Sequence, residues 1–282
     1  MTEERGKHYG VVHLRPQANP PVALDFYLRA AGVADADDAA ANADALIALG
    51  AVYVNDVRAQ SNSLTINSGD YVRVHTQPRR YQKPLALSDR ILEKTEQFLI
   101  VDKPAGIPVH AQVDNSHENL ISWLEAELDQ KLFVTHRLDT ETSGCLIIAR
   151  TQEAQREINQ LFRDRLIKKH YVAVTEKPVE PAHYTHYMQP SFKSPKILSG
   201  TPKEDWVRCE LKVLSCTKIS EEPQALFEVE IQLLTGRPQQ IRAQLSFLDA
   251  PIIGDIRYGS TIPSAEPNSI GLRCSELIWK SK

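Results

Sequence analysis

The sequence predicts an α+β protein in which a small domain precedes a larger one. Residues 21–77 contain two short helical patterns followed by strand-length apolar runs, and the remaining chain mixes such runs with a few amphipathic helices. A chain of 282 residues can bury a sizeable core in one large domain and still leave room for a small one. We therefore expect a lead-in over residues 1–20, a small domain over 21–77, a linker over 78–87 and a large domain over 88–282.

The composition is that of an ordinary globular protein, with 42% hydrophobic and 24% charged residues. The sequence has no apolar run long enough to span a membrane and no secretory signal at its start, so we expect no membrane association. Its four cysteines are scattered without a CxxC pair, which argues against a zinc site or a disulfide framework and favours a reducing, cytoplasmic location. With a net charge of −3, any nucleic-acid binding has to come from a local basic surface.

The small domain is predicted from apolar residues at helical spacing over 22–31 and 43–49, each stopped by a glycine. Short strands are predicted over 51–54 and 71–75, with a turn at Asn55-Asp56. The segments GAVYVNDVRA (50–59) and SGDYVRVH (68–75) resemble the S4 RNA-binding module, although the match is degenerate and basic residues on the helices are mostly absent. The domain is therefore either an RNA-binding module or a small cap with little affinity for RNA. Arg79, Arg80 and Lys83 are interpreted as charges of a solvated linker, with contact to the RNA backbone as the less favoured alternative.

The elements of the large domain follow from short apolar runs and from one strongly amphipathic helix. Strands are predicted over 97–101, 132–134, 145–149, 169–174, 209–214 and 226–234. Helices are predicted over 118–128, after the N-cap residue Thr151, and from Pro238 onward. The helix after Thr151 has a core stripe of Ala154, Ile158, Leu161, Phe162 and Leu166. Its arginines, Arg156, Arg163 and Arg165, lie on the other face, which is either solvated or in contact with RNA. Residues 177–204 contain many prolines and are predicted to be a partly irregular insertion.

The stretch THRLDTETSG, residues 135–144, lies between two of the predicted buried strands. A single Asp in such a loop is most often a turn residue. However, a carboxylate that is buried there without a partner is costly. The complete pattern HRLDxxTSG resembles the catalytic signature of the RluA family of pseudouridine synthases. The resemblance implies that Asp139 is the catalytic nucleophile and that His136, Arg137 and Thr142 support the pocket or contact RNA.

Further motifs of this family occur in the expected order, so that the resemblance covers about residues 88–279. They are DKPAGIPVH (102–110), KHYVAV (169–174), GRPQQIRAQL (236–245) and PIIGDIRYG (251–259). The resemblance implies the pseudouridine synthase fold, which is a mixed, mainly antiparallel sheet flanked by helices with a central cleft. The loop of the first motif is expected mainly to support the pocket by packing, with Lys103 as its best candidate for an RNA phosphate contact. Asp255 is expected to have a structural hydrogen-bonding role.

The remaining site residues are also implied by the resemblance. Tyr171 is expected to stack on a flipped uracil, and Arg242 to pair with Asp139 through two parallel hydrogen bonds that keep this carboxylate ionised. Lys169, Arg237 and Gln239 are expected to contact RNA or support the pocket. Gln239 and Gln244 stand where the family pattern has His, and because Gln cannot titrate, neither is a proton shuttle.

The expected function is therefore that of an isomerase, an intramolecular transferase that converts uridine to pseudouridine in structured RNA. Ribosomal RNA is the first expected substrate and transfer RNA the second. We expect no metal, no cofactor and no obligate protein partner, and a monomer. Two alternatives remain open: an RNA-binding protein that keeps the scaffold without catalysis, and an unrelated hydrolase with a Ser or His nucleophile, for which the sequence lacks a nucleophile elbow.

Overall fold

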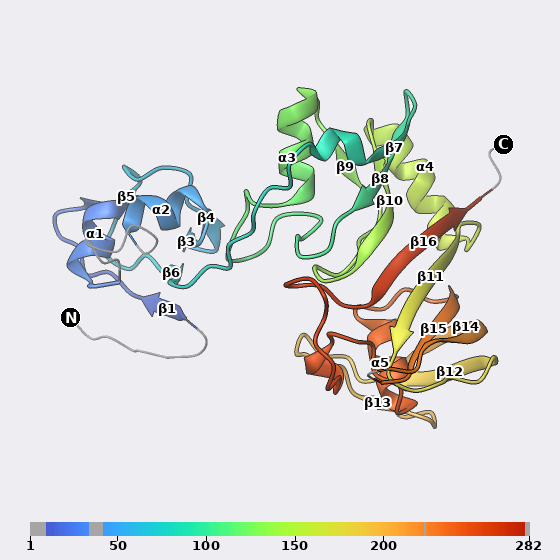
Figure 1. The fold of residues 1–282 in the computed structure, drawn as a ribbon. Coiled ribbons are helices and arrows are strands. Elements are labelled where there is room, and N and C mark those ends of the chain that lie inside the picture. The colour runs from blue at the N-terminus through green and yellow to red at the C-terminus, as the bar shows by residue number, and fades with distance from the viewer. Residues whose placement is uncertain (1–9, 34–41, 223, 280–282) are drawn as a thin grey trace. The chain divides into compact units, whose positions relative to one another are not determined.

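The computed structural model describes residues 10–33, 42–222 and 224–279 (Figure 1). The chain divides into two compact units. The first contains the chain up to Lys83 together with His110–Trp123, and the second contains Pro84–Val109 and Leu124–Lys282. The sequence did not indicate that residues 110–123 return to the first unit. Residues 1–9 of the predicted lead-in lie outside the described part of the chain.

Ion pairs explain why the returning segment belongs to the first unit. Arg79 Nε lies 3.0 Å from Asp114 Oδ2, and Arg80 Nη2 lies 2.7 Å from Glu118 Oε1. Both arginine side chains are more than half exposed, as expected for charges of a solvated linker, but the sequence did not indicate their ion pairs. Both hold the returning segment in place through charge-assisted hydrogen bonds.

The first unit contains a four-stranded antiparallel sheet in the order β1-β6-β3-β4 within the described residues. Its elements are β1 (Val11–Leu14), β2 (Val22–Ala23), α1 (Leu24–Ala30), α2 (Ala43–Ala48), β3 (Val52–Val54), β4 (Val57–Arg58), β5 (Thr65–Ile66) and β6 (Val72–His75). Two predictions were wrong here, because β1 lies within the predicted lead-in and β2 within the first predicted helix.

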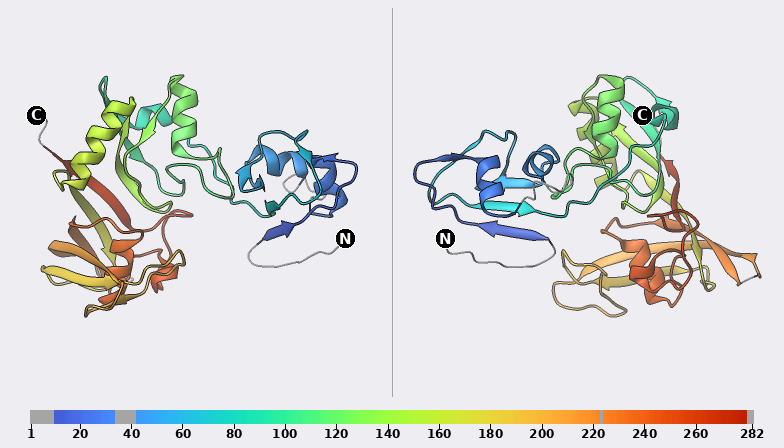
Figure 2. Two further views of the ribbon diagram at one scale, coloured as in Figure 1. Left: turned by 180° about the vertical axis from the view of Figure 1, so that it is seen from behind. Right: turned by 60° about the vertical axis from the view of Figure 1, so that its left-hand side comes forward.

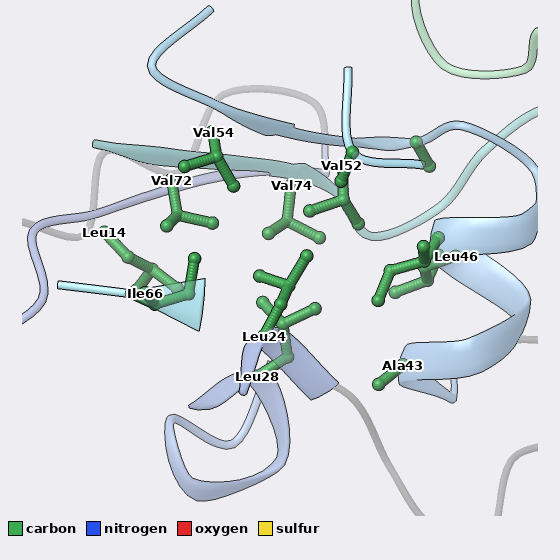
Figure 3. Packing of buried hydrophobic residues seen from close by; sticks show 13 residues of the cluster. Leu14, Leu24, Leu28, Ala43, Leu46, Val52, Val54, Ile66, Val72 and Val74 are labelled. Carbon is green, nitrogen blue, oxygen red and sulfur yellow. The ribbon is translucent and has the colours of Figure 1, made fainter. Parts of the chain in front are cut away.

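The core of this unit is built from alternating strand residues and one stripe from each helix (Figure 3). Val52, Val72 and Val74 are completely buried on the sheet face that packs against Leu24 and Leu46. This alternation is typical of a sheet with one face in the core. Helix α2 begins at Asn42, whose side chain accepts a hydrogen bond from the amide of Ala45 at 2.7 Å.

The second unit contains a ten-stranded sheet in its described residues. Strands β10 and β16 run parallel, whereas the other neighbouring strands are antiparallel. In sheet order the strands are β13 (Leu198–Ser199), β12 (His183–Met188), β14 (Val207–Ser220), β15 (Leu226–Leu233), β11 (Lys168–Thr175), β16 (Leu272–Ile278), β10 (Ser143–Ala149), β8 (Phe98–Lys103) and β7 (Ile91–Lys94), with β9 (Phe133–Val134) paired to β10. The predicted α+β class with a mainly antiparallel sheet is confirmed.

Few helices cover this sheet. The helical elements of this unit are η1 (Leu87–Arg90), α4 (Gln152–Arg163), α5 (Gln240–Phe247) and η2 (Ile256–Tyr258), and the boundary between the two units divides α3 (Leu120–Leu128) after Trp123. Helix α4 packs against β9 and β10 (Figures 1 and 2), where Ala154 and Ile158 meet Ile147 in one apolar cluster. The helix ends at Arg163, so Leu166 is 55% exposed and the prediction that it belongs to the core stripe is wrong. None of the helices within the described ranges is long and apolar enough to cross a membrane.

The predicted irregular insertion over 177–204 is more ordered than the sequence indicated. It contains β12 and β13, and all six residues of β12 pair with β14. The sequence of β12, HYTHYM, is rich in polar and aromatic residues, and prolines flank it on both sides. The alternation of buried and exposed side chains that is typical of a strand is seen only in the structure, where His186 and Met188 are buried and Tyr187 between them is not.

Candidate active site

Residues 135–142, which we call the HRLD loop, connect β9 to β10. The loop leads into β10 at the point where this strand pairs with β16. Gly144, the glycine of the motif, pairs with Cys274 of β16 and has a φ of +109°. A Cβ atom at this position would collide with the carbonyl oxygen of Cys274. Glycine is therefore required where β10 and β16 come together, and it allows the loop to lie directly over the centre of the sheet.

A cavity of about 270 Å³ opens at this place. Its wall is formed by the HRLD loop, by residues of β11, β15 and β16, and by the turn that leads into α5. Every site residue predicted from the sequence lines the cavity except Lys103. These residues are His136, Arg137, Asp139, Thr142, Lys169, Tyr171, Arg237, Gln239 and Arg242.

Arg242 is the centre of a buried ion-pair network, and its side chain is only 3% exposed. Its Nε and Nη2 atoms donate to both carboxylate oxygens of Asp255, at 2.6 and 2.9 Å. Its Nη1 donates to Glu141 at 3.1 Å and makes a long contact of 3.5 Å with Asp139. The pairing of Arg242 with Asp139 exists, but the prediction of two parallel hydrogen bonds between them is wrong. Asp255 takes the bidentate position, which fixes the plane of the guanidinium.

Burial lowers the pKa of Arg242, but hydrogen bonds and charge from Asp255, followed by Glu141 and Asp139, leave it raised above its ordinary value. The guanidinium is therefore a permanent positive charge at the floor of the cavity. The ring of Tyr258 lies beside it, with the Arg242 Cζ atom 5.2 Å from the ring centroid.

Asp139 is a partly buried carboxylate whose pKa lies above its ordinary value. Burial raises the pKa most, Arg242 lowers it, and the nearby charge of Glu141 raises it further. The sequence-based expectation that pairing with Arg242 keeps Asp139 ionised did not include the opposing effects of burial and Glu141 on the pKa. With its side chain 21% exposed, the carboxylate remains open to the cavity while losing much of its hydration.

Lys103 is completely buried beneath the HRLD loop, so its predicted contact with RNA phosphate is wrong. Its Nζ donates to the carbonyl oxygens of Pro104 and Ile107 at 2.9 Å and of Thr140 at 3.2 Å. Burial lowers its pKa to about 7, against the raising effect of Asp139 and Glu141. The ammonium ties the DKPAG loop to the HRLD loop.

His136 holds the HRLD loop against β10 and α4 through one hydrogen bond and one ring contact. Its Nε2 accepts a hydrogen bond from the amide of Ile147 at 3.1 Å, and its ring centroid lies 4.7 Å from that of Phe162. Burial, with a smaller effect from Lys169, lowers the pKa of His136 to about 3, so the ring is neutral at ordinary pH. At ordinary pH the HRLD loop is therefore held by a neutral histidine that can accept this hydrogen bond.

Tyr171 lies on β11 and is buried in the cavity wall. Burial raises the pKa of its phenol well above the ordinary value, and a hydrogen bond with the side chain of Cys274 raises it further. The ring is therefore a neutral aromatic surface beside Asp139. Arg137 and Arg237 are exposed at the mouth of the same cavity, where they can meet an anionic ligand.

Gln239 shapes the turn before α5. It has a φ of +57°, and its Oε1 accepts hydrogen bonds from Ser194 Oγ at 2.5 Å and from Tyr258 Oη at 2.7 Å. Behind it, Gln240 is buried, accepts a hydrogen bond from the amide of Arg237 and donates to Gln244 at 2.8 Å. The glutamines of the GRPQQIRAQL motif are thus hydrogen-bonding groups of the scaffold.

Sequence reasoning missed three residues of the site: Glu141, Gln240 and Tyr258. Each lies within a recognised motif, but at a position where the pattern alone gives it no role. Glu141 lies only two residues after Asp139, so the sequence could have suggested that it shares the cationic partner of Asp139, which is Arg242. No group of three or more His, Cys, Asp or Glu side chains in the described ranges is placed to hold a metal ion.

The model of the RNA pseudouridylate synthase family matches residues 97–247, just over half of the chain. This chain belongs to that family. The matched region contains the HRLD loop, Tyr171 and Arg242, so the family assignment rests on the segments that build the cavity.

Known relatives agree with this assignment. The chain is 29% identical over 224 residues to "RNA pseudouridine synthase 6, chloroplastic" of Oryza sativa subsp. japonica, covering 72% of this chain and 47% of the relative. It is 33% identical over 212 residues to the Arabidopsis thaliana protein of the same name, covering 68% and 45%. It is 29% identical over 215 residues to "Ribosomal large subunit pseudouridine synthase D" of Nitrosomonas europaea, covering 69% and 58%. The chain thus spans about half the length of these curated relatives.

Among solved structures, the fold is similar to that of "Human RNA Pseudouridylate Synthase Domain Containing 1". The TM-score is 0.55 at 23% sequence identity, and the similarity covers 70% of this chain and 80% of the human one. This similarity supports the assignment of the pseudouridine synthase fold.

Proposed function

We propose that this protein isomerises uridine to pseudouridine in RNA, with Asp139 as the nucleophile. The observation that carries the proposal is the placement of Asp139, Tyr171 and Arg242 around one cavity at the centre of the sheet. Membership of the RNA pseudouridylate synthase family supports the same reaction.

In the proposed reaction, the target uridine leaves its stack and enters the cavity, at a cost of a few kcal/mol. The neutral ring of Tyr171 provides a surface against which the uracil can stack. Asp139 then either attacks to form a covalent intermediate or takes a proton from C2′ of the ribose to form a glycal-type intermediate, and the bond between N1 of the base and C1′ of the ribose breaks. The base rotates, a bond forms between C5 and C1′, C5 loses its proton, and N1 gains one. When the new bond to C1′ forms, the carboxylate is released or the proton returns to C2′.

The surrounding residues have distinct roles in this proposal. Arg242, held by Asp255, keeps a positive charge beside Asp139, which favours the ionised carboxylate against the opposing effect of burial. An ionised carboxylate can act as a nucleophile without a metal or an activating base. Arg137 and Arg237 at the mouth would bind the phosphates that flank the target.

Ribosomal RNA is the first proposed substrate, because one relative is named a ribosomal large subunit pseudouridine synthase. Transfer RNA is the second, by analogy within the family.

The test is tritium release from RNA transcripts that carry uridine labelled at C5, because the isomerisation expels this hydrogen. We expect release by the wild type and by Asp164→Ala, a control that removes an exposed carboxylate from the end of α4. We expect no release by Asp139→Ala, although its affinity for RNA should be close to that of the wild type. Turnover by Asp139→Ala would refute the role of Asp139. RNA binding by the wild type without any release would favour a catalytically silent binding protein.

A further inference from the structure

The loop of residues 189–197 connects β12 to β13 and carries an exposed aromatic side chain, Phe192. We call it the Phe192 loop. It is closed at its base by a hydrogen bond from the amide of Gln189 to the carbonyl oxygen of Ile197, at 3.0 Å. Phe192 is fully exposed, with a relative accessibility of 108%, which is the highest among the exposed large hydrophobic residues that the structure describes.

The Phe192 loop is fixed to the rim of the catalytic cavity by two hydrogen bonds. Ser194 Oγ donates to Gln239 Oε1 at 2.5 Å, and the amide of Lys196 donates to Tyr258 Oη at 2.8 Å. Both acceptors belong to the candidate active site, because Gln239 lines the cavity and the ring of Tyr258 lies beside Arg242. The loop therefore holds Phe192 in a fixed relation to the site.

The charge around the Phe192 loop is positive. Lys193 is exposed next to Phe192 and has no ion pair within the described residues. Lys196 lines a second hollow of about 330 Å³ together with Arg257 and Phe247. Neither Lys196 nor Arg257 has an ion pair in the described part of the chain. Because the chain as a whole carries a net charge of −3, cations gathered around the Phe192 loop indicate an anionic ligand there.

We propose that the Phe192 loop is an RNA-binding arm of the catalytic unit. Phe192 stacks on an unpaired base that flanks the flipped uridine, and Lys193 neutralises a neighbouring phosphate. An exposed aromatic ring beside unpaired cations is the arrangement with which proteins bind single-stranded RNA. Ile197 of the same loop is also exposed, but the chain neighbours of Phe192, Ser191 and Lys193, are polar, and the cations around the loop favour an anionic RNA over an apolar protein surface. The proposal rests on the proposed function, since it assigns the loop to the same substrate.

The experiment compares Phe192→Ala, Phe192→Leu and Phe192→Tyr in the full-length chain. The probes are fluorescein-labelled ribosomal and transfer RNA transcripts for anisotropy and the C5-tritiated transcripts for kinetics. Leu85→Ala is the control, because Leu85 is 95% exposed and belongs to the same unit. We expect Phe192→Ala and Phe192→Leu to raise Kd by about 5- to 100-fold, with a larger effect on KM than on kcat, from the loss of one stacked base. Phe192→Tyr, which keeps the ring, should restore binding, and Leu85→Ala should bind like the wild type.

A second variant, Lys193→Ala, tests the phosphate contact. It should reduce the slope of log Kd against log salt concentration by about 1. Wild-type affinity in both Phe192→Ala and Phe192→Leu would overturn the proposal, as would failure of the wild type to bind either RNA. If the wild type binds RNA but releases no tritium, the proposed function fails, while the Kd comparison still tests the Phe192 loop.

Discussion

Replacing Arg242 by Lys tests whether the fork of the guanidinium, and not only its charge, organises the active site. In the structure, two nitrogens of Arg242 bind Asp255 and the third reaches Glu141 and Asp139. A lysine ammonium is a compact charge at the end of a flexible stem, so it can remain close to Asp255 or to Asp139 but cannot span both in one plane.

The magnitude follows from the contacts that are lost. A hydrogen bond to a charged group contributes about 1.5–3 kcal/mol, and Arg242→Lys loses at least two of them, which is about 3–6 kcal/mol in total. Because about 1.4 kcal/mol corresponds to a tenfold change in rate, a loss of this size would slow the reaction by about 10²- to 10⁴-fold if it fell entirely on the transition state. Any part that falls on the folded state instead lowers the free energy of unfolding.

Two measurements separate these contributions. Single-turnover tritium release gives the effect on the reaction, and urea unfolding gives the effect on stability. Arg163→Lys is the control, since Arg163 is exposed at the end of α4 and hydrogen-bonds only to Gln160 among the described residues. Wild-type rate together with wild-type stability in Arg242→Lys would refute the argument that the guanidinium fork matters.

Two further variants test the surroundings of Asp139. Glu141→Gln removes a negative charge that raises the pKa of Asp139, so the pKa should fall and the acid limb of the pH–rate profile should move to lower pH; an unmoved limb would contradict this. Gly144→Ala should destabilise the protein towards urea more than Gly259→Ala does, by about 1–3 kcal/mol, because both glycines have positive φ but only a Cβ at 144 meets backbone. Equal losses in the two variants would show that backbone strain alone matters.

Much of the fold was predictable because its elements are locally encoded. The HRLD loop between two apolar runs, the helix after Thr151 and the motif that leads into α5 were all recognised from residue types and spacing. The order of strands was not predictable. Strand β16 lies between β10 and β11, and nothing in its sequence, LRCSELI, indicates that position. Strand β12 was missed because its residues, HYTHYM, show no alternation of apolar and polar types in the sequence.

The site was predictable in its members but not in their contacts. Lysines are mostly exposed, so a lysine in a proline- and glycine-containing loop was assigned to RNA, whereas Lys103 is enclosed by three carbonyl groups. The resemblance correctly implied that Arg242 pairs with Asp139, but three carboxylates are near Arg242. Which of them takes the bidentate position depends on where α5 lies relative to the HRLD loop and to Asp255, and this is a property of the tertiary structure.

The central place of β16 has a consequence for how the protein folds. This strand follows all other described strands along the chain, yet it joins β10 to β11, and the contact between Cys145 and Ser275 bridges 130 residues. Such non-local pairing makes folding slow, because the entropy of closing a long loop is lost before the contacts form. During synthesis, β10 and β11 cannot acquire their common neighbour until residues 272–278 have been made. The catalytic cavity, which Leu272 helps to line, is therefore incomplete until β16 has paired with β10 and β11.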